Sequence, residues 1–450
     1  MPKCPSNEAT LTNTSNTTPR FDGSWRRLLS GSGTVLLIKI LGAFGGFLFS
    51  LLVARKFGDA ALGRAELFVL AITVGATLLR GGFEGAVVKL FGGWSSEGAH
   101  GRIIRRFLQW TKPLLLMAAA VTVWGFIMPG SKWGITMDSR LGLAIGSWIL
   151  IGWAGEALRG TGRVAWYALL QPGWWMLMGA VLIVLLGWQP TQVLSITALA
   201  LAIFGMASAV TLFRRSARLD KAAPLAHEKN QDGAVLRRLA LPIWMGSMLH
   251  LVLSWADTAM LAAWMDEAAV AHYRAAFRLA ALLTFTQFAV NALGAPTFGA
   301  LHASGDREGL RRTVHRIGWM NTAVALPGLL FLAVLGPWLL GFWGAAFSTP
   351  QVYSALLILL AGQCFNALCG PVMYLLNMTD GEKAGLVILA VSAVAQLSAA
   401  LFLVPAFGIV GGAASAALGM LFWNGLGVWY IRRKHGFIMV SLLNGWWRRS

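Results

Sequence analysis

Ionisable side chains interrupt several long apolar stretches of this sequence, where a charge is costly unless protein or water solvates it. The residues concerned are Lys39, Arg80, Glu84, Glu156, Asp257 and Arg278. Both signs of charge occur, so ion pairs are one expected outcome. Fixed cations at such depth also replace the hydration of an anion, and the planar guanidinium of arginine binds phosphate oxygens bidentately. These positions are therefore the first candidates for a binding or coupling site.

Composition places most of the chain in lipid. Hydrophobic residues make up 57% of the 450 residues and charged residues only 12%, whereas about 25% of a soluble protein is charged. The apolar segments are long enough for a helix to cross a hydrocarbon layer of ~30 Å. They do not alternate polar and apolar residues as the strands of an outer-membrane barrel do. The sequence thus predicts an all-α integral membrane protein and excludes a soluble enzyme.

Twelve transmembrane helices are predicted, and basic residues fall unevenly between the two sides. The expected spans are 33–54, 67–89, 111–128, 141–158, 164–187, 193–213, 239–264, 273–300, 319–341, 352–376, 384–404 and 409–431. Of the 37 Lys and Arg, 28 lie on the side of the termini and 6 on the opposite side. Because basic loops stay inside, both termini are expected in the cytoplasm. The net charge of +19 follows from this bias, so nucleic acid is not an expected partner.

The spans divide six and six around a long polar connection. We expect the following parts: a disordered cytoplasmic tail, 1–24; an N-lobe, 25–213; a cytoplasmic linker, 214–238; a C-lobe, 239–431; and a basic amphipathic C-terminal tail, 432–450. A shift of 208 residues sets 54–63 on 262–271, so the turns that follow the first helix of each half correspond. This match indicates an internal repeat of the kind found in transporters.

Several short motifs resemble the polysaccharide-biosynthesis flippases (Wzx type) of the multidrug/oligosaccharidyl-lipid/polysaccharide (MOP) exporter superfamily. In the first half they are Ile40-Leu41-Gly42, Leu52-Val53-Ala54-Arg55, Phe57-Gly58 and Leu62-Gly63. In the second half they are Leu241-Pro242, Asp257, Tyr273-Arg274-Ala275-Ala276, Pro296, Leu403-Val404-Pro405 and Phe407 to Ala414. The resemblance covers residues 33 to 432.

The resemblance implies two six-helix lobes (MOP/MATE-like) around a central cavity lined by the first two helices of each lobe. It also implies alternating access and translocation of an undecaprenyl-diphosphate-linked oligosaccharide across the bacterial inner membrane, for O-antigen, capsule or exopolysaccharide synthesis. Expected partners are the lipid-linked oligosaccharide, membrane lipids, and polysaccharide polymerase and chain-length machinery. No cofactor is expected.

Two depth-matched ion pairs follow from helical rise. Lys39 and Glu84 lie about 7–8 Å from the inner ends of their helices at 1.5 Å per residue, which predicts an inner pair. Asp257 and Arg278 lie about 8–10 Å from the outer ends, which predicts either a gate or coupling element or a static bridge within one lobe. Arg274 shares a helix face with Arg278, and is either a second substrate contact or an interfacial charge.

Other candidates keep two interpretations each. Arg80 either contacts substrate or forms an i,i+4 bridge to Glu84. Gln287 and Asn291 share a helix face, and their amides either bond sugar hydroxyls or join helices. The same holds for Gln363 and Asn366.

The sequence contains no catalytic constellation, metal-ligand spacing or phosphate-cradling loop, so an enzyme is not expected. Two alternatives to the flippase remain: a cation-coupled multidrug exporter of the same superfamily, and a membrane-embedded glycan polymerase or ligase. A polymerase or ligase needs a sizeable outer loop with acid and base residues, which is not expected here. Cavity charge separates the flippase from the exporter, because a diphosphate requires a net cationic cavity and a cationic drug an acidic one.

Overall fold

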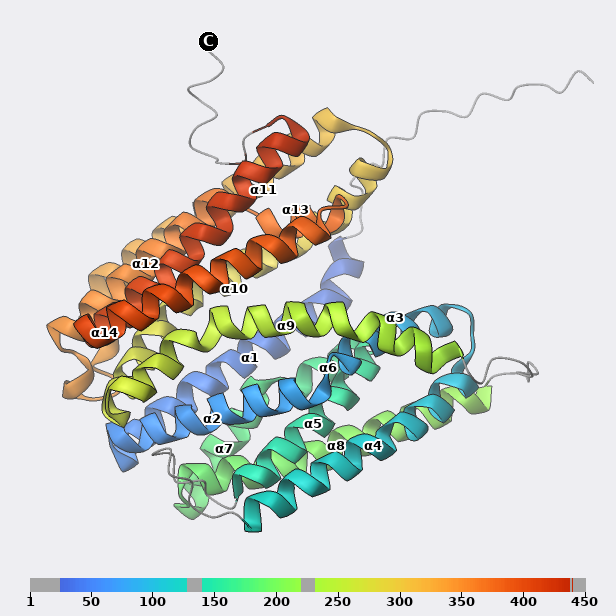
Figure 1. Cartoon of the computed structure of the whole chain (residues 1–450), viewed down its shortest axis with the longest axis horizontal. Coiled ribbons are helices and arrows are strands. Elements are labelled where there is room, and N and C mark those ends of the chain that lie inside the picture. The colour runs from blue at the N-terminus through green and yellow to red at the C-terminus, as the bar shows by residue number, and fades with distance from the viewer. Residues whose placement is uncertain (1–24, 128–139, 220–230, 438, 440–450) are drawn as a thin grey trace, which may run out of the picture.

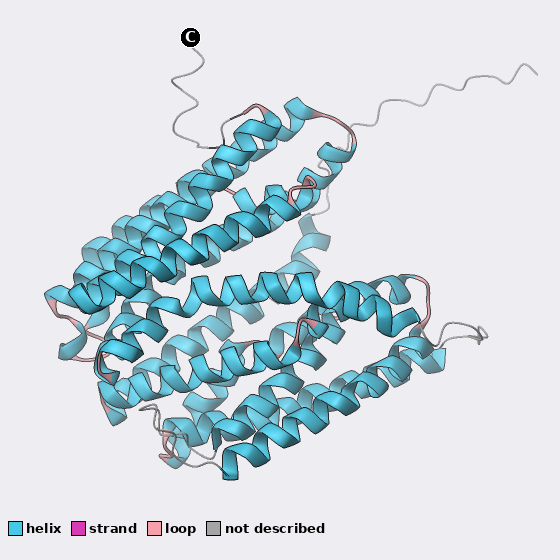
Figure 2. Cartoon of the chain, viewed as in Figure 1, coloured by secondary structure: helices cyan, strands magenta, loops and turns pink. Residues whose placement is uncertain are grey.

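All secondary structure in the described part of this computed structural model, residues 25–127, 140–219, 231–437 and 439, is helical (Figures 1 and 2). The first half contains α1 (Trp25–Phe57), α2 (Asp59–Arg80), α3 (Phe83–Ser96), α4 (His100–Ile127), α5 (Arg140–Gly160), α6 (Val164–Leu169), α7 (Pro172–Leu186) and α8 (Pro190–Leu219). The second contains α9 (Gln231–Trp264), α10 (Glu267–Ala303), α11 (Arg307–Leu340), the 3-10 helix η1 (Ala345–Phe347), α12 (Pro350–Cys369), α13 (Val372–Met378) and α14 (Glu382–His435). Eight of the described helices are long and apolar enough to cross a membrane.

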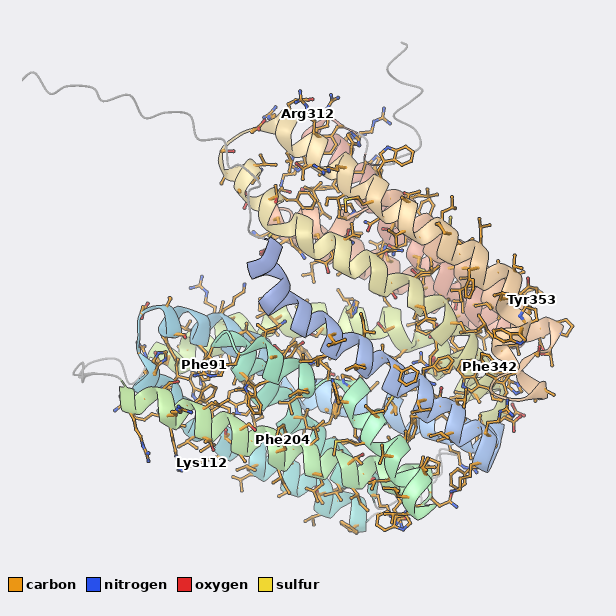
Figure 3. All side chains as sticks on the ribbon, turned by 180° about the vertical axis from the view of Figure 1, so that it is seen from behind. Phe91, Lys112, Phe204, Arg312, Phe342 and Tyr353 are labelled. Carbon is orange, nitrogen blue, oxygen red and sulfur yellow. The ribbon has the colours of Figure 1, made fainter. Side chains whose placement is uncertain are left out.

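The helices form two lobes. Helices α1–α8 make the N-lobe, α10–α14 make the C-lobe, and α9 runs between them (Figure 1). The lobes approach each other at the end that carries the α1–α2 and α9–α10 turns, which we call the hairpin end, and separate toward the other end. Seen from behind, the hairpin end of the C-lobe, marked by Phe342 and Tyr353, lies against α1 (Figure 3), and Arg55 Nε donates to the backbone oxygen of Phe342 at 2.6 Å. The expectation of an all-α protein with two lobes is confirmed.

Glycine and proline break several predicted spans. The span 67–89 is two helices, α2 and α3, because Gly81 and Gly82 adopt positive φ angles of 57° and 78°, which cost glycine little. The span 352–376 is broken before Pro371. Gly408, with φ of 54°, kinks α14 between the predicted spans 384–404 and 409–431, so this interruption agrees with the prediction. Discontinuous helices of this kind often lie at transporter sites.

The internal repeat extends far beyond the turn that indicated it. A shift of 208 residues places the first residue of α2, Asp59, on the first residue of α10, Glu267. The same shift places the start of α6, Val164, on the start of α13, Val372. From α2 to α6 and from α10 to α13, the two halves therefore keep one register with no net insertion.

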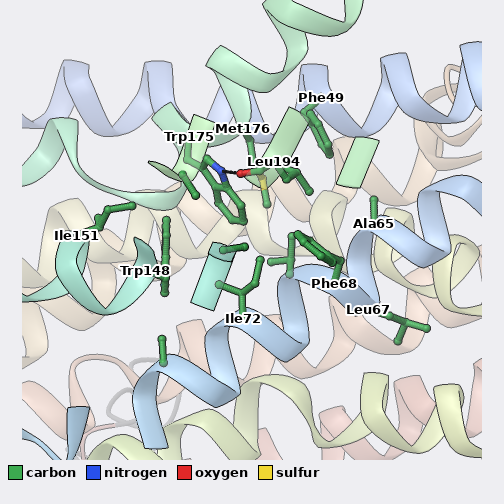
Figure 4. Close-up of a cluster of buried hydrophobic side chains, with 14 of the residues drawn as sticks. Phe49, Ala65, Leu67, Phe68, Ile72, Trp148, Ile151, Trp175, Met176 and Leu194 are labelled. Carbon is green, nitrogen blue, oxygen red and sulfur yellow. Dashed lines mark hydrogen bonds between the residues drawn. The ribbon is translucent and has the colours of Figure 1, made fainter. Parts of the chain in front are cut away.

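One face of α2 is fixed by the N-lobe core. Phe68 and Ile72 of α2 lie in a cluster with Trp148 of α5 and Trp175 of α7 (Figure 4). The two tryptophan rings are 4.7 Å apart, and Trp175 Nε1 donates to the backbone oxygen of Leu194 at 2.7 Å. This packing leaves another face of α2 to meet the C-lobe.

Helix α9 belongs to both lobes. Its first part packs against α3, where Leu236 and Ala240 form a buried cluster with Ala86. A Cβ on Gly82 would collide with the backbone oxygen of Ala240, so glycine there permits the close approach. Further along, α9 packs on α14, where Gln396 Nε2 donates to the backbone oxygen of Leu253.

The predicted tails lie mostly outside the described residues. Residues 1–24 and 440–450 belong to that part of the chain. Helix α14 continues to His435, and Met439 is buried in the C-lobe core. The tail expected over 432–450 therefore begins as the end of a transmembrane helix.

Candidate functional site

One carboxylate of the N-lobe meets two arginines of the C-lobe. Arg278 Nη1 lies 2.5 Å from Glu66 Oε1, and Arg274 Nε donates to Glu66 Oε2 at 3.2 Å. The side chain of Arg278 is 14% exposed, that of Arg274 is 9% exposed and that of Glu66 is 2% exposed. We call these residues the central triad. It joins the two lobes through buried charge and carries one positive charge more than its carboxylate balances.

Local helix geometry builds this triad. Arg274 and Arg278 lie four residues apart on α10, so they occupy one helix face. The guanidinium carbon of Arg274 is 4.2 Å from the ring centre of Trp255 and 4.8 Å from that of Phe277, which stabilises the cation away from water. Arg274 Nη1 is buried and has no hydrogen-bond partner among the described residues. A donor thus remains at the lobe interface for an anionic ligand.

The predicted pairing of Asp257 with Arg278 is wrong. Arg278 pairs with Glu66, whereas Asp257 accepts hydrogen bonds from Tyr273 Oη and, at 2.7 Å, from the backbone N–H of Thr258. Asp257 is 0% exposed. The pair was predicted because the two residues lie at similar depths along their helices. Whether two side chains meet also depends on the direction in which each points around its helix axis, and Arg278 points from α10 toward α2.

Glu66 is the site residue that sequence reasoning missed. The predicted span began at residue 67, whereas α2 begins at Asp59, so the carboxylate fell into an assumed loop. The signal was available in the repeat. The 208-residue shift sets Glu66 on Arg274, the residue it contacts.

A second group of charges lies within the N-lobe. Arg80 Nε is 3.3 Å from Glu84 Oε1, and each side chain is 13% exposed. The two residues face each other across the break between α2 and α3, which favours the bridge interpretation of Arg80. Glu84 has Arg80 as its partner there, while the side chain of Lys39, in α1, lies outside the described part, so the Lys39–Glu84 pair stays a prediction. Nearby on α5, Arg159 Nε lies 2.6 Å from Glu156 Oε2.

The candidate amides join helices of one lobe. Asn366 Nδ2 donates to Gln287 Oε1 at 2.7 Å, and Asn424 Nδ2 donates to Asn366 Oδ1 at 2.9 Å. Asn321 Nδ2 donates to Asn291 Oδ1 at 2.7 Å. These bonds connect α10, α11, α12 and α14, which favours the interpretation as interhelical bonds over a path for sugars.

Within the described residues, no three His, Cys, Asp or Glu side chains are grouped as metal ligands would be. Cys364 and Cys369 are free thiols.

Comparison with known proteins identifies the fold. Residues 242–402 match the MatE family model. The probable flippase AglR of Haloferax volcanii is 24% identical over 182 residues, which cover 39% of this chain and 37% of that protein. The match thus spans little more than a third of this relative.

Solved structures match over nearly the whole chain. The lipid II flippase MurJ, in an inward closed conformation, superposes with a TM-score of 0.66 and 15% identity, covering 92% of this chain and 90% of MurJ. A multidrug resistance MATE family transporter of the MOP superfamily, in an inward-facing conformation, superposes with a TM-score of 0.65 and 15% identity. The match covers 89% of this chain and 98% of that transporter. The chain therefore has the fold of MOP-superfamily transporters.

Proposed function

We propose that this protein is a flippase of the polysaccharide-biosynthesis (Wzx) type. It carries an undecaprenyl-diphosphate-linked oligosaccharide across the bacterial inner membrane by alternating access, for surface polysaccharide synthesis. The central triad is the observation that supports this proposal most. Two buried arginines at the interface of the lobes share one carboxylate, and Arg274 retains an unpartnered donor.

A diphosphate suits this arrangement because it must leave water to cross the membrane. Arg274 and Arg278 replace its hydration with charge-assisted hydrogen bonds. The diphosphate then competes with Glu66 for the same guanidinium groups. Once Glu66 loses them, the ion pairs that join α2 to α10 are broken and the lobes can separate at that point.

The same charges disfavour the multidrug exporter. A carrier of cationic drugs needs a carboxylate open to its substrate, but Asp257 is fully buried and hydrogen bonded to Tyr273, and Glu66 is held by two arginines. The fold is shared with a flippase and with multidrug transporters alike, so charge carries the distinction. The name of the Haloferax relative agrees with a flippase.

The distribution of basic residues supplies the orientation. It supports an orientation with both termini in the cytoplasm and the hairpin end outside. The lobes meet at the hairpin end (Figure 1), which in this proposed orientation corresponds to a state closed to the outside. The substrate then enters from the inner leaflet.

Binding of undecaprenyl diphosphate to the purified protein tests this proposal. Arg278→Gln and Arg274→Gln are each expected to weaken binding at least tenfold, which is about 1.4 kcal/mol. Arg312→Gln is the control, since this arginine is 78% exposed on α11. Unchanged binding in both triad variants, together with uptake of a cationic dye by proteoliposomes, would support the drug exporter instead.

A further inference from the structure

One carboxylate at the start of α9 meets two arginines of α4. Arg102 Nη2 lies 2.5 Å from Asp232 Oδ1, and Arg106 Nε lies 2.7 Å from Asp232 Oδ2. The side chain of Asp232 is 5% exposed, and the guanidinium carbon of Arg102 is 4.4 Å from the ring centre of Trp94. We call Asp232, Arg102 and Arg106 the α9 triad. It lies at the end of the N-lobe opposite the hairpin end, where α9 passes α3 (Figure 1).

The α9 triad repeats the chemistry of the central triad. In both, two arginines one helical turn apart share one buried carboxylate, so the three side chains carry a net charge of +1. In both, the first of the two arginines lies over a tryptophan ring, which is Trp94 here and Trp255 in the central triad. A phosphate offers the guanidinium fork the same paired oxygens as a carboxylate. The α9 triad therefore has the groups that a phosphate site requires.

The two triads differ in their relation to the internal repeat. Glu66 and Arg274 correspond under the 208-residue shift and contact each other, so the local axis of the repeat passes between them. The central triad lies on this axis, whereas the α9 triad does not. The shift carries the two arginines of the α9 triad from α4 to α11 of the C-lobe. That second place shows what packing alone requires at this contact.

At the counterpart in the C-lobe the same contact is apolar. Leu310 and Val314 of α11 stand where α4 has its two arginines, and Met439 stands one residue before the position equivalent to the carboxylate. All three side chains are buried in one apolar cluster. Buried ion pairs are often no more stabilising than apolar residues of similar size. Packing thus does not require the charges of the α9 triad, and they point to the binding of an anion.

Lipid headgroups lie near the depth of the α9 triad. Asp232 lies seven residues before the predicted span that begins at 239, which is about 10 Å along a helix. The headgroup layer extends roughly 5–8 Å beyond the hydrocarbon. The exposed residues Arg105, Arg237 and Arg238 on the same two helices add positive charge around the triad. Anionic lipids are therefore concentrated next to it.

We propose that the α9 triad binds the phosphate of an anionic phospholipid headgroup. Phosphate oxygens accept hydrogen bonds from both guanidinium groups in the place that Asp232 occupies. The lipid therefore competes with Asp232, and a bound phosphate weakens the ion pairs that attach the start of α9 to α4. The lipid composition of the leaflet at that end thus regulates how firmly the N-lobe holds α9. The inference does not depend on the substrate of the central triad.

Binding of phosphatidylglycerol to the purified protein, followed by native mass spectrometry, tests this inference. Arg102→Gln combined with Arg106→Gln should weaken binding roughly tenfold or more. The matched control is Arg311→Gln combined with Arg312→Gln, at the end of the C-lobe opposite the hairpin end (Figure 3). These arginines also share one carboxylate, that of Glu308, but are 48% and 78% exposed. Because the control removes the same charge from an exposed site, binding should fall by less than about twofold.

Asp232→Asn separates a phosphate site from a purely structural ion pair. The variant removes the carboxylate that competes with the lipid, so binding should strengthen by about threefold or more. A structural pair predicts no gain, because the variant only leaves two buried cations without this carboxylate. The triple variant Arg102→Leu, Arg106→Val and Asp232→Leu copies the apolar contact of the C-lobe. It should keep the thermal unfolding midpoint of the parent and lose binding, so lost binding is not confused with lost folding.

Undecaprenyl diphosphate and inorganic phosphate, measured in parallel, identify the source of the phosphate. A double arginine variant that loses undecaprenyl diphosphate but keeps phosphatidylglycerol would overturn the inference. So would equal losses in the α9 triad and its control, or weaker binding in Asp232→Asn. Displacement of phosphatidylglycerol by inorganic phosphate at millimolar concentration would also contradict a lipid site. Arg274→Gln and Arg278→Gln should leave phosphatidylglycerol bound at the α9 triad, so this inference and the proposed function fail or stand separately.

Discussion

The guanidinium of Arg80 fills the space that a side chain on Gly152 would occupy. A Cβ built on Gly152 of α5 would collide with Arg80 Nη1. The same guanidinium reaches Glu84 and, at 3.4 Å, Thr77 Oγ1. The absence of a side chain at residue 152 therefore allows the N-lobe to hold this charge.

Gly152→Ala should displace Arg80 from this position. We expect a loss of about 1–3 kcal/mol in stability, the usual cost of overpacking, seen as a lower thermal unfolding midpoint in detergent. Gly93→Ala on α3 is the control, because a Cβ there has nothing within 4 Å and helix propensity improves. Equal midpoints for Gly152→Ala and the parent would show that the arginine relocates without cost.

A double-mutant cycle separates the two interpretations of Arg80. If the residue is structural, Arg80→Ala and Glu84→Ala each lower stability, and the double variant loses less than the sum, by about 0.5–3 kcal/mol. Flipping then survives in the double variant. If Arg80 contacts the substrate, Arg80→Ala abolishes surface glycan while the amount of protein in the membrane stays normal.

Exchanging Glu66 and Arg274 tests the pairing at the local axis. Glu66→Arg places three cations together, and Arg274→Glu places two carboxylates beside Arg278, so each single variant should lose roughly 3–5 kcal/mol, the cost of breaking a buried pair. The double exchange restores one opposite-charge contact and should recover part of the folded protein, measured by size-exclusion chromatography. If the double exchange yields no more folded protein than the single variants, the other neighbours of the two residues, rather than their mutual contact, determine which charge each position tolerates.

Removing the hydrogen-bond donor of Tyr273 should lower stability more than removing the charge of Asp257. Tyr273→Phe removes a hydrogen bond to a buried carboxylate and should lower stability by about 1.5–3 kcal/mol. Asp257→Asn keeps one acceptor oxygen, which can hold the bond from the backbone N–H of Thr258, and its amide Nδ2 can donate to Tyr273 Oη, so the unfolding midpoint should change less. The reverse order would indicate that the ionised carboxylate, and not its hydrogen bonds, stabilises this part of α9.

Apolar length was sufficient to predict the helical class, and the two lobes followed from the long polar connection and from the family resemblance. Apolar length did not reveal the interruption at Gly81 and Gly82, because paired glycines also occur where helices simply pack closely. At Gly82 a Cβ would collide with the backbone oxygen of Ala240 in α9, a tertiary contact that no local pattern encodes.

The candidate site was predicted in part. The sequence identified Arg274 and Arg278 as cations on one helix face, and that much agrees with the structure. Their partner was assigned wrongly, since depth in the membrane fixes one coordinate and leaves rotation about the helix axis free. Glu66 escaped notice because charged residues near the end of a span are normally read as loop.

Helix α9 has a mechanical role that follows from its position between the lobes. Its first part is held by α3, and Asp232 at its start is 2.5 Å from Arg102 Nη2 of α4. Its later part is held by α14. In the alternating-access cycle proposed above, a change in the angle between the lobes must either bend α9 or separate its first part from α3. Pro242 lies in the held part and lacks one backbone hydrogen bond, which lowers the stiffness of the helix there. In that proposed cycle, the elastic energy of α9 is part of the barrier between the two arrangements of the lobes.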